Sequence, residues 1–290
     1  MGVAMRSTEL LGKRMMRRVR LALAALFLAA LGSCGGGGGG QQLVQLTPAT
    51  AGTTFTSTIN SAQTGMPYAV DIWLPPGYAE GMANYPVVYA TDCEYRWTTL
   101  LQDVQQFAAR GGAKVILVNI CAGSSDRRWV DFTMPGAAPY FRFLTLELIP
   151  SIDASYRTDP SNRTLSGHSL SGEFALCALY MEDPAHRYFT SIVSEECSCW
   201  YDASQNWSQG LAQPIAMELA MYGADRNLPI NLVMAGDTTS NERYVQVVYS
   251  AIASQQFQNL RLTQPTYGLG HVPMDGPAFA DALSFIFPGH

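Results

Sequence analysis

The chain has few of the groups that mark metal and nucleic-acid sites. It contains only four histidines, and its six cysteines include no Cys-x-x-Cys pair, so their spacing fits neither a zinc ribbon nor a zinc finger. Its 18 basic residues stand against 23 acidic residues, for a net charge of −5. Because an acidic surface does not favour polyanions, we expect no nucleic-acid partner, and nothing in the sequence calls for a metal or cofactor.

The chain also lacks a long apolar run near its N-terminus. The run that is there, Leu21–Leu31, follows a basic segment, is too short to span a bilayer stably, and is typical of a secretory signal peptide. The sequence Leu31-Gly32-Ser33-Cys34 resembles a bacterial lipobox, in which Cys34 would be lipidated; the alternative is an ordinary signal followed by an incidental cysteine. We therefore predict a lipoprotein-type signal peptide over residues 1–33 and a glycine-rich tether over residues 34–52.

This reading places the protein in the bacterial cell envelope, in contact with the membrane through the lipid anchor only. Residues 53–290 are long enough for one domain with a full core, and no repeat or second linker interrupts them. Without residues 1–33 the chain keeps 12 basic and 22 acidic residues, a net charge of −10.

The hydrophobic pattern of residues 53–290 predicts an α/β domain. Two early segments alternate as antiparallel strands do, and the later strand-like segments are apolar on both faces and separated by helical patterns. Such alternation favours a doubly wound, mostly parallel sheet with antiparallel entry strands, whose functional residues gather past the carboxyl ends of its strands. The predicted strands are 53–60, 68–73, 86–90, 114–120, 163–165, 189–194, 229–235 and 260–266, and the predicted helices are 98–109, 141–156, 173–180, 211–221, 243–255 and 278–287.

One segment carries a candidate nucleophile. In Gly167-His168-Ser169-Leu170-Ser171-Gly172 a short strand leads through small residues into a helical pattern, which favours a sharp turn with Ser169 exposed at its apex. The common pattern is G-x-S-x-G, and here Ser171 stands at its fifth position with the glycine one residue later. A strand–turn–helix without catalytic function is the competing interpretation.

A serine nucleophile needs a histidine base and an orienting carboxylate. His271 lies in a glycine-rich loop after the last predicted strand, which is where the base falls in chain order for a nucleophile elbow. Asp237 follows a buried strand between Ser169 and His271 and is the predicted acid, with Glu242 as the alternative; a helix cap is the competing role for Asp237. The oxyanion donors are predicted to be the N–H groups of Leu170 and Cys93, with Glu94 as the alternative to Cys93.

Five cysteines follow Cys34, and one or two disulfides are plausible in an oxidising compartment. Cys93 and Cys121 both come just after predicted strands and are the first pair to test.

Several ordered motifs give the chain a resemblance to a known family. They include Asp71-Ile72-Trp73-Leu74-Pro75-Pro76-Gly77-Tyr78, Tyr85-Pro86-Val87-Val88-Tyr89-Ala90-Thr91-Asp92 and Arg163-Thr164-Leu165-Ser166-Gly167-His168-Ser169. Together they resemble the putative-esterase, or esterase D-like, family, which includes siderophore, feruloyl and acetylxylan esterases. The resemblance spans about residues 53–290, implies an α/β-hydrolase fold, and carries over Ser169 and His271 as nucleophile and base. The chain departs from the family pattern at Cys93 and Ser171, where glycine is usual.

The resemblance also implies that the segment around Arg128 lies beside the substrate pocket. Glu94 and the aromatic residues Trp200 and Tyr201 are further candidates for its wall, with ordinary packing as the alternative for the aromatic pair. We expect a serine carboxylic-ester hydrolase that acts through an acyl-enzyme on a small or aromatic ester. The alternatives are an acyltransferase to a sugar or lipid, and a non-catalytic binding lipoprotein of the envelope.

Overall fold

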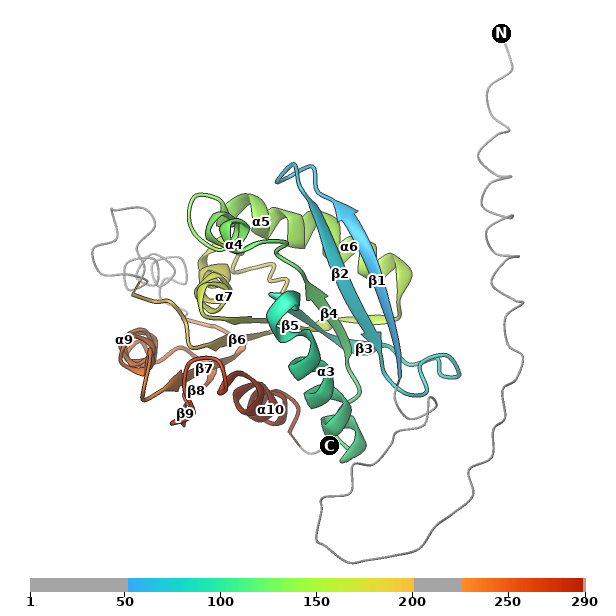
Figure 1. Cartoon of the computed structure of the whole chain (residues 1–290). Helices are drawn as coiled ribbons and strands as arrows, with labels where there is room; N and C mark the ends of the chain where they lie inside the picture. Colours follow the sequence, from blue (N-terminus) through green and yellow to red (C-terminus); the bar gives the residue numbers. More distant parts are fainter. Residues whose placement is uncertain (1–51, 201–225, 289–290) are drawn as a thin grey trace, which may run out of the picture. The chain divides into compact units, whose positions relative to one another are not determined.

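The computed structural model describes residues 52–200 and 226–288, and within them a mixed sheet of nine strands forms the centre (Figure 1). The main strand order is β1-β2-β4-β3-β5-β6-β7-β8, and β9 pairs with β7. The strands are β1 (Thr53–Asn60), β2 (Pro67–Leu74), β3 (Tyr85–Thr91), β4 (Ile116–Ile120), β5 (Thr158–His168), β6 (Ser191–Glu195), β7 (Asn231–Asp237), β8 (Arg261–Thr263) and β9 (Thr266–Tyr267).

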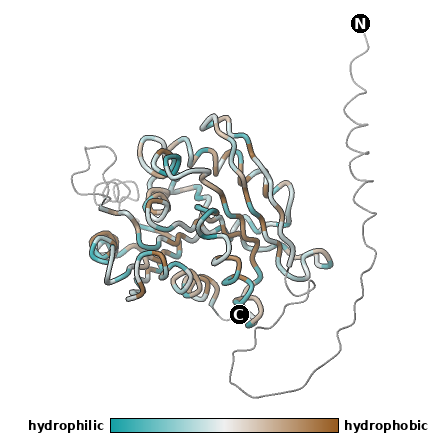
Figure 2. The backbone as a smooth tube through the Cα atoms, viewed as in Figure 1, coloured by the Kyte–Doolittle hydropathy of each residue, from teal (hydrophilic) through white to brown (hydrophobic). Residues whose placement is uncertain are grey.

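The sheet is antiparallel at its entry and parallel beyond it, as the hydrophobic pattern predicted. β1 pairs with β2 and β2 with β4 in antiparallel register, whereas β3 to β8 pair in parallel. All five residues of β4 and of β6 are buried, because a parallel sheet is covered by helices on both faces. Edge strand β1 is mostly exposed and contains few apolar residues. Figure 2 shows hydrophobic residues running along the central strands.

Helices cover both faces of the sheet. Helices α5, α6, α7 and α9 bury apolar side chains against one face, and α3 and α10 pack together on the other, against Trp73, Val88 and Leu117 (Figure 1). In α3 the buried residues Leu100, Val104 and Phe107 recur at helical spacing. The helical elements are α3 (Cys93–Ala109), α4 (Ser125–Asp131), α5 (Ala137–Phe143), the π-helical segment η1 (Leu144–Leu148), α6 (Ile149–Ser155), α7 (Leu170–Met181), α9 (Glu242–Ala253) and α10 (Asp275–Ile286).

Three helical regions depart from the sequence-based elements. Helix α3 begins at Cys93, five residues before the predicted start, because the chain turns at Asp92 directly into the helix. The single helix predicted over 141–156 is three successive helical segments from 137 to 155. Helix α4, which is capped by the Ser124 hydroxyl, was not predicted, and the predicted helix 211–221 lies outside the described residues.

Among the described residues, no helix is both long and apolar enough to cross a membrane. The predicted signal peptide, Cys34 and most of the tether lie outside those residues.

Candidate functional site

Ser169 lies at the apex of a tight turn between β5 and α7. Its φ of 61° is positive, which is an unusual backbone conformation for a residue other than glycine. Its own N–H donates to the carbonyl of Glu195 at 2.9 Å. Small neighbours permit the turn: a Cβ at Gly167 would overlap the carbonyl of Ser171, and one at Gly172 would lie 2.7 Å from the Glu195 oxygen. The backbone therefore takes the conformation that the sequence predicted for a nucleophile elbow.

His271 lies in the loop between β9 and α10, and its ring meets a carboxylate that the sequence analysis did not select. Nδ1 of His271 is 2.9 Å from Oε2 of Glu196, whose side chain is fully buried. Glu196 directly follows β6 and has a φ of 49°, which turns its side chain toward the histidine. The Ser240 hydroxyl lies farther from the same nitrogen, at 3.3 Å.

The contact predicted for Asp237 is thus made by Glu196. Asp237 is the last residue of β7, and its carboxylate holds backbone instead: Oδ2 accepts from the N–H groups of Leu269 at 2.6 Å and Gly270 at 2.9 Å. Oδ1 accepts from the hydroxyl and N–H of Thr239. Asp237 therefore supports the loop that carries His271 without touching the imidazole.

The alternative acid also lies apart from the ring. Glu242 is the first residue of α9 and packs beside Gly236, and its carboxylate makes no hydrogen bond to His271 among the interactions of the described chain.

Glu196 is held in its ionised form. Burial raises its pKa, but the hydrogen bonds from His271, the N–H of Asp237, Ser240 and the N–H of Asn241 outweigh burial, and the pKa lies below its usual value. A carboxylate that is ionised at neutral pH can fix the Nδ1–H tautomer of His271 and stabilise an imidazolium.

The sequence does contain a signal that could have identified Glu196 as a candidate acid. Glu195 and Glu196 directly follow the predicted strand 189–194, and a place just after a predicted strand is the criterion that selected Asp237. In the structure Glu195 is the last residue of β6 and Glu196 is the next residue, and two such consecutive side chains point to opposite sides.

The two predicted oxyanion donors are both at helix N-termini. Leu170 is the first residue of α7, and Cys93 is the first residue of α3. N–H groups in the first turn of a helix have no partner within the helix, and the dipole there favours negative charge. The predicted oxyanion donors therefore both occupy positions where such N–H groups can bind an anion.

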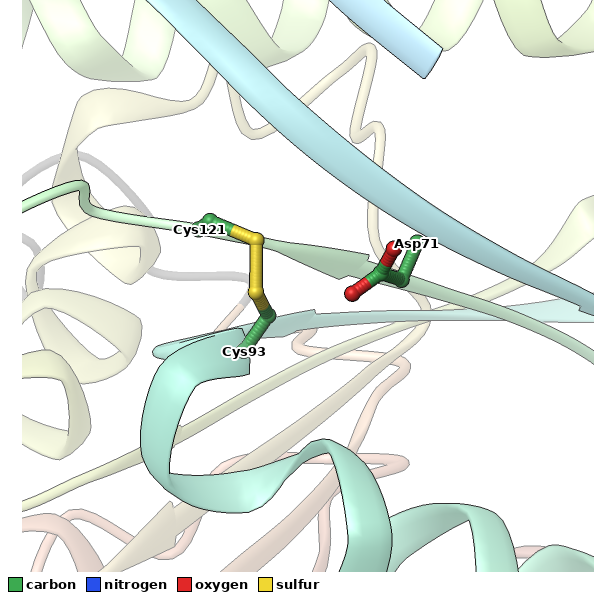
Figure 3. Close-up of side chains that lie close together, drawn as sticks. All are labelled: Asp71, Cys93 and Cys121. Carbon is green, nitrogen blue, oxygen red and sulfur yellow. A yellow bond between two sulfur atoms is a disulfide. The ribbon is translucent and has the colours of Figure 1, made fainter. Parts of the chain in front are cut away.

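A disulfide holds the second of these positions. Cys93 is joined to Cys121, which follows β4, and Asp71 of β2 lies next to the bond (Figure 3). Metal ligation requires free thiolates, so Asp71, Cys93 and Cys121 do not form a metal site while the disulfide is intact. The bond instead connects the segments that follow β3 and β4.

A second disulfide joins Cys197 to Cys199 and encloses Ser198. The N–H of Ser198 donates to the carbonyl of Ser169 at 3.0 Å, and the two hydroxyl oxygens are 3.3 Å apart. Among the described cysteines, Cys177 is free and buried.

Asp92 links the turn at Ser169 to the segment that begins at Cys93. It has a φ of 64°, and its carboxylate accepts from Nε and Nη2 of Arg128 at 2.7 and 3.0 Å. Ser171 donates its hydroxyl to the same carboxylate at 2.7 Å and accepts from the N–H of His168 at 2.9 Å. Ser171, which departs from the usual glycine, thus bonds the elbow directly to the residue before Cys93.

A cavity of about 320 Å³ opens above these groups. Ser169 and His271 line it together with Arg128, so the structure brings these three predicted residues to one site. Glu94 is exposed and does not line it, because its carboxylate accepts from the N–H groups of Ala122 and Gly123. Trp200 is half exposed and is not part of the described lining, and Tyr201 lies outside the described residues. The described lining comprises Asp92, Tyr95, Arg96, Arg128, His168, Ser169, His271, Val272 and Asp275.

A buried ionic cluster forms the floor of the cavity. Nε of Arg96 donates to both oxygens of Asp275 at 3.0 and 3.2 Å, and Nη2 donates to Ser166 and Glu195. Burial raises the pKa of Glu195 well above its usual value, whereas the pKa of Asp275 is lowered because Arg96 outweighs its burial. The charge of Arg96 is thus compensated within the floor by the carboxyl groups that it contacts.

With the sheet order, the elbow and the histidine loop in place, the chain fits a class of hydrolases that share this fold. Residues 61–260 match the family model described as "Putative esterase", and the chain belongs to this family. The fold is that of the α/β-hydrolases.

Three relatives illustrate the similarity. The chain is 24% identical over 237 residues to the ferri-bacillibactin esterase BesA of Bacillus subtilis (strain 168), covering 70% of this chain and 79% of that protein. An IroE-like serine hydrolase from Shewanella oneidensis superposes with a TM-score of 0.69 at 21% identity, covering 81% of this chain and 80% of that one. The siderophore hydrolase EstB from Aspergillus nidulans gives a TM-score of 0.68 at 16% identity, with 84% and 97% covered.

Proposed function

We propose that this protein hydrolyses carboxylic esters through an acyl-enzyme on Ser169. The observation that carries the proposal is the hydrogen bond between Glu196 and Nδ1 of His271, at 2.9 Å, beside a serine held at a positive φ in the same cavity. Membership of the esterase family supports the reaction class. Glu196 takes the orienting role that the sequence analysis gave to Asp237.

In this mechanism the hydroxyl of Ser169 attacks the ester carbonyl and passes its proton to Nε2 of His271. Negative charge develops on the carbonyl oxygen, toward which the N–H groups of Leu170 and Cys93 would donate. His271 then protonates the leaving alcohol, and a water molecule, activated by the same imidazole, releases the acid and restores Ser169. The Ser169 hydroxyl must turn from Ser198 to the imidazole, an adjustment that active sites commonly complete once substrate is bound.

The cavity suits a small or aromatic ester. Its two arginines already face carboxylates, Arg128 on Asp92 and Arg96 on Asp275, so the wall carries little net charge. Tyr95 is two-thirds exposed and offers a ring for an aryl group. Since one relative is named a ferri-bacillibactin esterase and another a siderophore hydrolase, we propose siderophore-type esters as the first natural substrates to assay.

Hydrolysis of p-nitrophenyl acetate by wild-type protein and by Ser169→Ala tests this function. We expect Ser169→Ala to lose at least about 10³-fold in kcat while keeping its melting temperature. Ser284→Ala, which changes an exposed serine of α10, is the matched control and should hydrolyse the ester as the wild type does. Wild-type turnover in Ser169→Ala would overturn the proposal.

We also propose that the protein is an envelope lipoprotein anchored through Cys34. The lipobox-like Leu31-Gly32-Ser33-Cys34 and the following glycine run support this. In the native host, Cys34→Ser should leave the protein soluble in the envelope or unprocessed, whereas the wild type should fractionate with membranes and incorporate labelled fatty acid. Wild-type protein that is wholly soluble and carries no acyl chain would contradict the anchor.

A further inference from the structure

His168, the residue before the nucleophile, is bonded to the loop of the other histidine. It is the last residue of β5, its side chain is almost fully buried, and it lines the cavity. Its Nε2 lies 2.7 Å from the backbone carbonyl oxygen of His271, and the two ring centroids are 4.7 Å apart. A carbonyl oxygen only accepts hydrogen bonds, so Nε2 of His168 carries the proton and donates.

The loop that receives this bond needs support. It runs over residues 268–274, and its residues Leu269 and Val272 are 52% and 71% exposed, so packing alone holds them weakly. Asp237 holds the N–H groups of Leu269 and Gly270 from the β7 side. His168 approaches from the β5 side and holds the next residue, His271, by its carbonyl.

We propose that His168 is a positioning residue: the hydrogen bond from its Nε2–H to the carbonyl of His271 fixes the imidazole of His271 between Ser169 and Glu196. The inference rests on the proposed function, in which His271 is the base. It gives the nucleophile strand a direct bond to the base, so that the residue beside the attacking serine sets the position of the residue that deprotonates it. A displacement of about 1 Å in such a group can cost about 10²-fold in rate.

The surroundings of His168 keep it in this supporting role. Asp275, Arg96 and His271 are the charged or titratable groups that act on it. Burial, together with Arg96 and the imidazole of His271, outweighs Asp275 and the hydrogen bond to the His271 carbonyl and lowers the pKa of His168 to about 4. A neutral His168 places no second positive charge beside the imidazolium that forms on His271. Since its Nε2 donates to a carbonyl, which cannot take up a proton, His168 is not itself a relay through that atom.

Three substitutions separate the hydrogen bond from the bulk of the side chain. His168→Gln keeps an N–H donor at nearly the position of Nε2, His168→Asn carries the same amide one methylene too short, and His168→Leu fills space without a donor. We expect kcat on p-nitrophenyl acetate to fall by about 10- to 100-fold in His168→Leu and His168→Asn, with KM changed only a few-fold, and to recover to within a few-fold in His168→Gln.

A second measurement does not depend on activity. In protein labelled with ¹⁵N-histidine, the Nδ1 proton of His271, which bonds to Glu196, should give an NMR signal that is preserved in His168→Gln and broadened or shifted in the other two variants. A purely structural role would lower the melting temperature of the variants without separating Gln from Asn.

The proposal is overturned if His168→Leu keeps wild-type kcat, or if His168→Gln loses as much kcat and as much of the His271 signal as His168→Asn. Failure of the proposed function would show differently, as full activity in Ser169→Ala. The His271 signal remains readable in either case.

Discussion

The carboxylate of Glu196 lies 2.9 Å from Nδ1 of His271 and places the acid of the site after β6. The carboxylate at the end of β7, Asp237, holds the N–H groups of Leu269 and Gly270 in the loop before the histidine. The two carboxylates are connected, because the N–H of Asp237 donates to Oε1 of Glu196 at 2.5 Å. One therefore orients the ring, and the other supports the loop that carries it.

Because the two carboxylates have different roles, their amide substitutions should affect different properties. Glu196→Gln should lower kcat on p-nitrophenyl acetate by about 10²- to 10⁴-fold, because an amide can no longer stabilise the imidazolium. Asp237→Asn should mainly lower the melting temperature, because an amide nitrogen would face backbone N–H groups that need an acceptor. Glu242→Gln is the control and should change neither. The assignment would be reversed if Asp237→Asn lost most of its kcat at an unchanged melting temperature while Glu196→Gln kept nearly wild-type kcat.

Ser171 should contribute to both stability and rate. Its hydroxyl is fully buried and donates to the Asp92 carboxylate at 2.7 Å. Removing this bond in Ser171→Ala should cost about 1.5–3 kcal/mol of unfolding free energy, measured in urea. It should also lower kcat because Asp92 precedes Cys93, the proposed oxyanion donor. Ser171→Gly restores the usual family residue and should lose as much. Wild-type kcat in both variants would show that the bond does not position the loop.

Removal of the two disulfides should have different effects on stability and on kcat. Cys93 and Cys121 are 28 residues apart, so Cys93→Ser with Cys121→Ser should destabilise the fold by about 3–4 kcal/mol through the unfolded chain. Cys197 and Cys199 are two residues apart and close too small a loop for that effect. Replacing both with serine should lower kcat but change the free energy of unfolding little, because the loop carries Ser198 and follows Glu196. Denaturant unfolding and steady-state kinetics measure both, and equal stability losses would contradict the distinction.

Stability should respond to pH through Asp103. Burial raises its pKa to about 7, with Asp275 raising it further and Arg110 and Arg96 opposing. The native state therefore keeps a proton that the unfolded chain loses near pH 4, so this contribution is complete below about pH 4 and is lost as pH rises to about 7. Asp103→Asn, which cannot ionise, should raise the melting temperature more at pH 8 than at pH 5. An equal gain at both pH values would contradict the raised pKa.

Local patterns predicted the fold and the elbow well. The apolar segment 86–90 lies within buried β3, and the small residues around Ser169 form the turn that they predicted. Contacts between residues far apart in the sequence could not be predicted from such local patterns. Glu196 directly follows β6 and Asp237 is the last residue of β7, and the sequence does not state which one turns toward His271. That depends on the positive φ of Glu196 and on the path of the loop after β9. The bond between Ser171 and Asp92 joins residues 79 positions apart, which no local pattern encodes.

Covalent labelling tests the central claim most directly. Diisopropyl fluorophosphate reacts with serines activated by a neighbouring base, and peptide mass spectrometry locates the adduct. We expect one adduct per chain, on the peptide containing Ser169, absent in Ser169→Ala and formed much more slowly in Glu196→Gln. An adduct on another residue, or equal labelling of wild type and Ser169→Ala, would contradict it.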